Sequence, residues 1–119
     1  MAKKLFLLAI VIPLFASLVA GRCTDQRDVV IRNLRTYARG SVYGSNLNLL
    51  FDRLITTTGY DHVGSGSNRV YGFSECYGSP NCRSCLLAAV NSIRSAAPRA
   101  IGARICKALC YLRYENYRI

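Results

Sequence analysis

The sequence has few of the groups that enzymes use for acid–base or nucleophilic chemistry. It contains one histidine, His62, in a stretch rich in Gly and Ser, where a histidine is more often solvated than catalytic. It has no G-x-S-x-G nucleophile motif, no phosphate-binding loop and no HExxH metal motif. Asp61 and Glu75 could be regarded as a carboxylate pair, but nothing in the sequence places them together. We therefore predict a binding protein that is not an enzyme and uses no cofactor.

Only one long apolar run is present, and it lies at the N-terminus. Two lysines precede an uncharged stretch over residues 5–20, and charge returns at Arg22. This order is typical of a secretory signal peptide, and the run is shorter than the roughly 20 residues of a membrane-spanning helix. We expect residues 1–21 to be a cleaved signal peptide and residues 22–119 to form one secreted domain without a transmembrane anchor. An uncleaved N-terminal anchor is the alternative.

Acidic residues are also scarce, with 6 Asp and Glu against 16 Lys and Arg and a formal net charge of +10. Most of this charge comes from arginine, whose planar guanidinium suits carboxylates, phosphates and vicinal oxygens. A positive field favours anionic surfaces such as microbial envelopes, acidic polysaccharides or nucleic acids. The arginines are scattered rather than gathered in a block, so the sequence does not indicate a dedicated nucleic-acid-binding tail.

Cysteine is the exception to these shortages. An even number of cysteines in a short exported chain indicates a disulfide framework, although the count does not give the connectivity. The competing interpretation is a zinc site, because Cys82 and Cys85 have C-x-x-C spacing and two later cysteines could complete four thiolates. An oxidising compartment favours the disulfides. The six cysteines are Cys23, Cys76, Cys82, Cys85, Cys106 and Cys110.

Apolar residues at helical spacing predict two helices. The first should run from about residue 46 to 57, with Ser45 or Asn46 as its N-cap. Its buried stripe is formed by Leu47, Leu50, Phe51 and Leu54. The second should run from Cys82 to about residue 96, where Pro98 blocks its continuation.

Alternating apolar residues predict strands around these helices. Residues 101–108 and the segment from Cys110 onward each have one buried side, and residues 69–73 form another strand. One or two short strands are expected within residues 23–42, and residues 59–69 are expected to be a Gly/Ser loop. The predicted fold class is α+β, with two α-helices packed on a single antiparallel β-sheet.

Five segments in a fixed order resemble the ginkbilobin-2-homologous family, the plant cysteine-rich secretory repeat or stress-antifungal domain. The similarity covers about residues 42–117. The segments are S-N-L-N-L-L-F-D-R-L (45–54), V-Y-G-F-S-E-C (70–76), C-x-x-C-L (82–86), I-G-A-R (101–104) and C-Y-L-R-Y-E (110–115). The resemblance implies the two-helix fold already predicted, held by three disulfides, and secretion to the apoplast.

The resemblance also implies two of the three disulfides, Cys76–Cys82 and Cys85–Cys110. The family normally links its first cysteine to one near the end of the second helix, where this sequence has an alanine, Ala97. A third bridge between Cys23 and Cys106 is therefore a hypothesis. Alternation places Cys106 on the outward face of its strand, whereas Cys23 would be expected to point inward.

Mannose binding and antifungal action are implied by the ginkgo-seed member. Its sugar-contacting residues are an Asn after the first cysteine, the Arg of the Gly-Ala-Arg strand and the Glu of the last strand. Arg104 and Glu115 match the last two, and Thr24 stands where the Asn would be. A guanidinium donates hydrogen bonds and a carboxylate accepts them, and sugar hydroxyls do both. The alternative is an Arg104–Glu115 salt bridge with no ligand.

Three hypotheses about function follow. The first is a secreted plant defence protein, antifungal or antimicrobial, that binds mannose-type or other cell-wall glycans through Thr24, Arg104 and Glu115. The second is an extracellular protein-interaction or signalling module without sugar binding. The third is a cationic antimicrobial that acts on membranes through charge alone, in which case its activity should fall steeply with salt.

Overall fold

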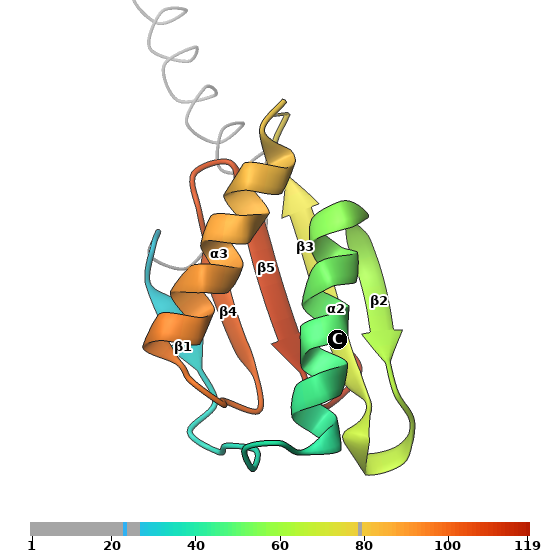
Figure 1. Cartoon of the computed structure of the whole chain (residues 1–119). Helices are drawn as coiled ribbons and strands as arrows, with labels where there is room; N and C mark the ends of the chain where they lie inside the picture. The colour runs from blue at the N-terminus through green and yellow to red at the C-terminus, as the bar shows by residue number, and fades with distance from the viewer. Residues whose placement is uncertain (1–22, 24–26, 79) are drawn as a thin grey trace, which may run out of the picture.

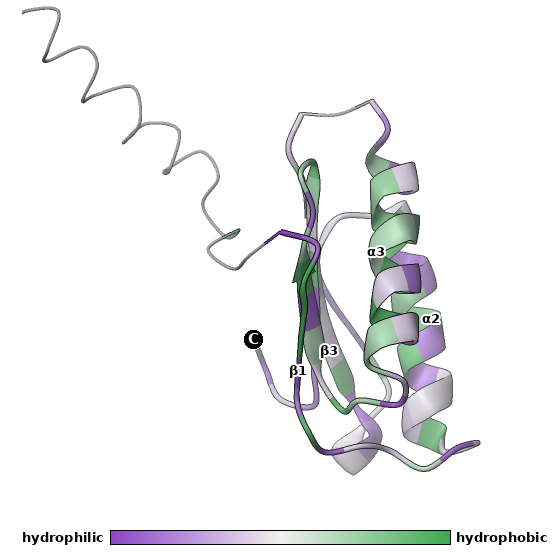
Figure 2. Ribbon diagram, turned by 90° about the vertical axis from the view of Figure 1, so that its left-hand side faces the viewer, coloured by the Kyte–Doolittle hydropathy of each residue, from purple (hydrophilic) through white to green (hydrophobic). Residues whose placement is uncertain are grey.

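The computed structural model describes residue 23 and residues 27–78 and 80–119, in which two helices lie side by side on one face of an antiparallel sheet (Figure 1). The predicted signal peptide and Thr24 lie outside the described residues. The helices are α2 (Val42–Thr56) and α3 (Cys82–Ala96). Figure 2 shows both on the same side of the sheet, with the C-terminal residues on the other side. The predicted fold class is therefore confirmed.

Five strands make up the sheet of the described residues, in the order β1-β4-β5-β3-β2. Strand β5 is central, and it pairs with β3 on one side and β4 on the other. The remaining two strands lie at the edges. The strands are β1 (Val30–Arg32), β2 (Gly59–Val63), β3 (Val70–Cys76), β4 (Ala103–Cys106) and β5 (Cys110–Glu115).

Helix α2 begins one turn earlier than predicted, so the expected N-cap at Ser45 or Asn46 is wrong. Ser41 is the cap, because its side chain accepts a hydrogen bond from the backbone N–H of Gly44 at 3.2 Å. The extra turn buries Tyr43 against the core. A glycine at position 44 weakens the helical signal in this turn, and the capping bond with the burial of Tyr43 outweighs it.

Helix α3 has the predicted bounds and buries the residues that face the sheet. Leu86, Ala89, Val90 and Ile93 recur at helical spacing and are almost fully buried. The helix ends at Ala96, just before Pro98. Two leucines of α2, Leu50 and Leu54, complete this core and are inaccessible to solvent. Burial of each such side chain contributes about 1.5–3 kcal/mol.

The stretch predicted as a Gly/Ser loop over residues 59–69 is instead mostly structured, and this prediction is wrong. Strand β2 occupies its first half and a short 3-10 turn, Gly66–Asn68, its second. Strand β2 lies at the edge of the sheet, where Val63 is its only fully buried residue. An edge strand shows little hydrophobic alternation, and so it lacked the signal that identified the inner strands.

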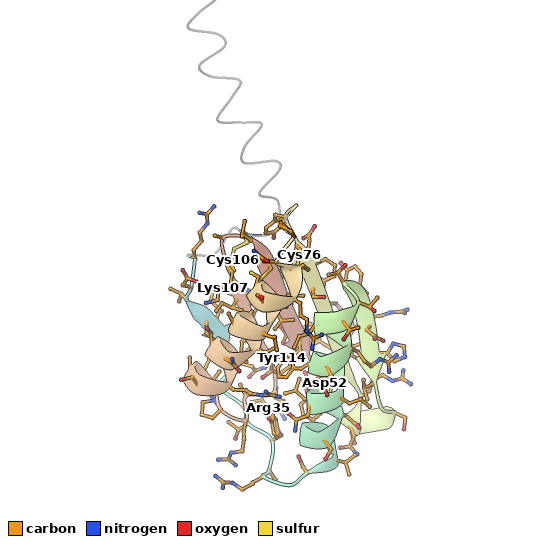
Figure 3. The ribbon with its side chains drawn as sticks, turned by 45° about the horizontal axis from the view of Figure 1, so that its top comes forward. Arg35, Asp52, Cys76, Cys106, Lys107 and Tyr114 are labelled. Carbon is orange, nitrogen blue, oxygen red and sulfur yellow. A yellow bond between two sulfur atoms is a disulfide. The ribbon has the colours of Figure 1, made fainter. Side chains whose placement is uncertain are left out.

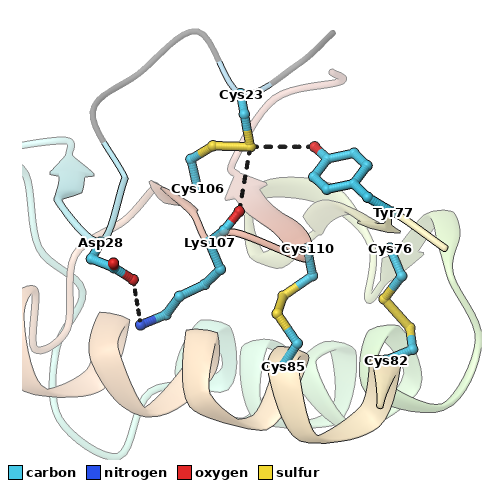
Figure 4. Close-up of a disulfide and its surroundings, with 9 residues drawn as sticks. All are labelled: Cys23, Asp28, Cys76, Tyr77, Cys82, Cys85, Cys106, Lys107 and Cys110. Carbon is cyan, nitrogen blue, oxygen red and sulfur yellow. Dashed lines mark hydrogen bonds and ion pairs between the residues drawn. A yellow bond between two sulfur atoms is a disulfide. The ribbon is translucent and has the colours of Figure 1, made fainter. Parts of the chain in front are cut away.

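Three disulfides join the ends of these elements, and together they use all six cysteines. Figure 4 shows two of them attaching the start of α3 to the sheet, through Cys76–Cys82 on β3 and Cys85–Cys110 on β5. The third joins the N-terminal segment to β4 and completes the family's set of three. Figure 3 shows Cys76 and Cys106, from two different bridges, at the same end of the domain.

The hypothetical Cys23–Cys106 bridge is present, with a Cα–Cα distance of 5.4 Å. The objection that Cys106 faces outward fails because that end of the outer face is itself covered. Cys106 is inaccessible to solvent and packs with Phe73 and Tyr111 in a second apolar cluster. Cys23 lies against this cluster, and its sulfur is 3.3 Å from the Tyr77 hydroxyl.

The opposite end of the domain is held by two buried tyrosines rather than by disulfides. Tyr114 donates a hydrogen bond to the carbonyl of Ala100 at 2.7 Å, and Tyr43 donates to the carbonyl of Ile101. Burial raises the pKa of both hydroxyls above the ordinary value for tyrosine, and the nearby Glu115 carboxylate adds to this. Both groups therefore remain protonated donors at neutral pH, and they fix the segment that leads into β4.

The long bridge should stabilise the domain more than the short one. The residues joined by Cys23–Cys106 are 83 apart in the sequence, and those joined by Cys76–Cys82 are 6 apart. Chain entropy then predicts losses of about 4.5 and about 2.4 kcal/mol when each pair is changed to alanine. Urea unfolding of the two double variants measures the difference, and mapping of non-reduced peptides checks the pairing. A larger loss for the short bridge would contradict the prediction.

Candidate functional site

The outer face of the sheet, on the side away from both helices, gathers the predicted binding residues. Residues alternate along β5, so that Leu112 and Tyr114 face the core while Arg113 and Glu115 face outward. On the neighbouring strand β4, Arg104 also faces outward, opposite Arg113 in the register. The prediction that Arg104 and Glu115 share a face of neighbouring strands is therefore consistent with the register. Their role in binding stays a prediction.

Glu115 pairs with an arginine that the prediction did not include. Arg113 donates a hydrogen bond from Nε to Glu115 Oε2 at 3.0 Å, and its Nη2 donates to the Tyr117 hydroxyl at 3.1 Å. Burial alone would lower the pKa of Arg113, but these hydrogen bonds outweigh it and raise that pKa overall. The signal for this pair was present in the sequence, because residues two apart in a strand lie on one face.

Gly102 provides the space that the Glu115 carboxylate occupies. The register places Gly102 next to Ala103 and therefore opposite Glu115. A Cβ atom at position 102 would overlap Glu115 Oε1. A glycine is thus required at position 102, because the Glu115 side chain fills the space where a Cβ atom would lie. The Glu115 side chain is 9% exposed.

Aromatic rings extend this face toward the β2 edge. Tyr60 and Phe73 lie with ring centroids 4.4 Å apart, and Phe73 and Tyr111 with centroids 6.2 Å apart. Tyr71 of β3 is opposite Glu115 in the register. Alternation predicts Tyr111 on the same face as Arg113 and Glu115, but the sequence gave no warning of the rest of this row, because Tyr60 fell in the predicted loop. The face therefore combines guanidinium donors, a carboxylate acceptor and apolar ring surfaces.

The residues considered for catalysis are not arranged for it. Asp61 accepts a hydrogen bond from the backbone N–H of His62 at 2.8 Å and pairs with Arg53 of α2 at 2.9 Å. It therefore does not orient the imidazole, which is exposed and whose ring centroid lies 6.0 Å from that of Tyr71. Alternation places Asp61 on the helix side of the sheet, and Glu75 lies on the outer side with Phe73.

The C-x-x-C motif is divided between two bridges. Cys82 is bonded to Cys76 and Cys85 to Cys110, so these four residues hold each other as disulfides rather than a metal as thiolates. In the part of the chain that the structure describes, no helix combines the length and apolarity needed to cross a membrane.

These features define a disulfide-stapled α+β module with a polar and aromatic sheet face. The chain belongs to the salt stress response/antifungal family, whose model matches residues 22–117. The resemblance stated from the sequence is therefore confirmed.

Three curated plant proteins are similar to the chain. It is 32% identical over 108 residues to an antimicrobial ginkbilobin-2-like protein of Castanea crenata, covering 84% of this chain and 45% of that protein. It is 28% identical over 108 residues to Plasmodesmata-located protein 7 of Arabidopsis thaliana, covering 82% and 33%. Cysteine-rich repeat secretory protein 38 of the same plant is 32% identical over 89 residues, covering 68% and 35%. The chain thus spans a third to a half of each relative.

Two solved structures share the fold. They are the tandem DUF26 ectodomains of the Arabidopsis thaliana cysteine-rich receptor-like proteins PDLP5 and PDLP8. The first has a TM-score of 0.69 and 24% identity, covering 79% of this chain and 51% of that chain. The second has a TM-score of 0.72 and 22% identity, covering 76% and 49%. Both show two helices over an antiparallel sheet to be the fold of this family.

The contact between Gly102 and Glu115 makes a prediction about coupling. Gly102→Ala should destabilise the domain by about 1–3 kcal/mol, because the added methyl displaces the carboxylate. In the double variant with Glu115→Ala the clash is absent, so the two losses should fall short of additivity by about 0.5–3 kcal/mol. Urea unfolding of the four proteins in the cycle measures this. Simple additivity would show that the two positions do not compete for space.

Proposed function

We propose that this domain is a secreted plant defence protein that binds mannose-type or other cell-wall glycans on its outer sheet face. The observation that carries the proposal is the cluster of Arg104, Arg113 and Glu115 beside the exposed ring of Tyr117, whose hydroxyl accepts a hydrogen bond from Arg113. The names of two relatives, one antimicrobial and one a secretory protein, support the defence role and the secretion. The expected signal peptide over residues 1–21 supports the same compartment.

The residues of this cluster have different roles in the proposed sugar binding. Arg104 is half-buried and can donate to ring hydroxyls from its planar fork. Glu115 is mostly covered, and its Oε2 already accepts from Arg113. It therefore acts as an acceptor at the rim and fixes the Arg113 guanidinium. Aromatic rings alongside provide apolar surface for the C–H groups of a sugar.

The N-terminal segment is anchored to the same face. Cys23 is bonded to Cys106, which is two residues from Arg104 on β4. Thr24 follows Cys23 directly in the sequence, and we retain it as the third proposed contact. Its hydroxyl can both donate and accept a hydrogen bond, as the amide of an asparagine can.

A glycan array on correctly oxidised protein tests the proposal. Mannose oligomers should bind, and Arg104→Ala and Glu115→Gln should each weaken binding by about tenfold or more, the loss of a charge-assisted hydrogen bond. Arg83→Ala is the matched control, because this exposed arginine lies on α3, on the far side of the sheet. Unchanged binding in both site variants would refute the site.

A protein-interaction role is the second candidate, and two exposed tyrosines favour it. Tyr60 is 59% exposed and Tyr117 is 51% exposed, and tyrosine is enriched in protein interfaces. This role predicts a tight extracellular protein partner and no sugar selectivity on the array. An antimicrobial that acts through charge alone would lose activity steeply with salt and would be indifferent to Glu115→Gln.

A further inference from the structure

A pocket lies at the β2 edge of the sheet, and its Tyr71 is opposite Glu115 of the Arg104–Glu115 cluster in the strand register. It has a volume of about 500 Å³, and Gly72 and Ile119 are among its lining residues. The side chains that give it chemical character come from β2, from β3 and the residue before it, and from the C-terminal segment. They are Tyr60, Asp61, His62, Arg69, Tyr71 and Arg118.

Two guanidinium groups line this pocket, those of Arg69 and Arg118, together with the Asp61 carboxylate and Ile119, the last residue of the sequence. Among the described residues, neither Arg69 nor Arg118 forms an ion pair with a carboxylate. Arg69 donates from Nε to the carbonyl of Gly64 at 3.1 Å, which orients its guanidinium and leaves the two terminal nitrogens as donors. The one acidic side chain, Asp61, is engaged at both oxygens, by Arg53 and by the backbone of His62.

The remaining walls suit a sugar ring better than a bare ion. Tyr60 is 59% exposed and Tyr71 is partly exposed, so the two rings offer apolar faces and hydroxyls to an occupant. Guanidinium forks match a planar carboxylate in a bidentate geometry. A pocket with two such forks and two tyrosines is therefore complementary to a saccharide that carries a carboxylate.

We propose that this pocket binds a uronate residue of an acidic glycan. Its carboxylate pairs with Arg69 and Arg118, and its ring lies against Tyr60 and Tyr71. The charged residues of this pocket are distinct from Arg104, Arg113 and Glu115 of the proposed mannose site, whereas Tyr71 is opposite Glu115 in the register. This pocket would make the β2 edge of the outer face select sugars that carry a negative charge.

Calorimetry with trigalacturonate tests this inference, with its methyl ester as the uncharged probe of the same sugar. We expect trigalacturonate to bind and the ester to bind at least about tenfold more weakly. The ester carries no negative charge and cannot form a bidentate ion pair with a guanidinium. The double variant Arg69→Gln/Arg118→Gln should lose about tenfold or more. Arg39→Gln/Arg83→Gln is the matched control, because both arginines are exposed outside the pocket and the net charge changes equally.

Several outcomes would overturn the proposal. Equal affinity for trigalacturonate and its ester would exclude recognition of the carboxylate. Equal losses of affinity in the two double variants would show that only the net charge of the protein matters. Equal competition by a sulfated sugar would exclude selectivity for the carboxylate. Arg118→Gln alone, at an exposed side chain, keeps the test valid if Arg69→Gln impairs folding. Loss of trigalacturonate binding in Arg104→Ala would place the sugar in the other cluster instead.

Discussion

The structure depends on the two-sided packing of its central strand, β5. Its inward residues, Cys110, Leu112 and Tyr114, are buried against the helices, and Cys110 is bonded to α3. Its outward residues, Arg113 and Glu115, form the ion pair at the centre of the proposed site. Successive side chains of a strand point to opposite faces, so the residues that β5 buries in the core determine where its outward residues lie. A change that shifts β5 for the core therefore shifts the binding residues as well.

The sequence predicted well the helices and strands that bury apolar residues at regular spacing. Helix α3 has its predicted bounds because Leu86, Ala89 and Ile93 all face the sheet and Pro98 stops the helix. Strands β4 and β5 were found from their alternation for the same reason. The start of α2 was missed because the cap at Ser41 precedes a glycine-containing turn, and β2 was missed because an edge strand buries little.

The sequence predicted individual residues of the candidate site but not how they contact one another. Arg104 and Glu115 came from a family resemblance and do share a face, and Glu115 accepts a hydrogen bond from Arg113, which the prediction did not include. Arg113 lies two residues from Glu115 in the same strand, so alternation alone places this pair on one face. The position of Arg104 beside them depends on the register between β4 and β5, which neither strand specifies alone. The second apolar cluster around Cys106 was likewise invisible, because it forms from β3, β4, β5 and the N-terminal segment together.

The arrangement of the bridges has a consequence for resistance to proteases. Cys23–Cys106 closes a covalent ring around most of the described chain, and Cys85–Cys110 overlaps its end. A single cut by a protease at any point between residues 23 and 110 therefore leaves the two fragments joined. The exposed residues 64–67, 78 and 80–81 could be nicked without releasing a piece of the domain. A protein built in this way can lose the continuity of its backbone and still keep its sheet face in one molecule.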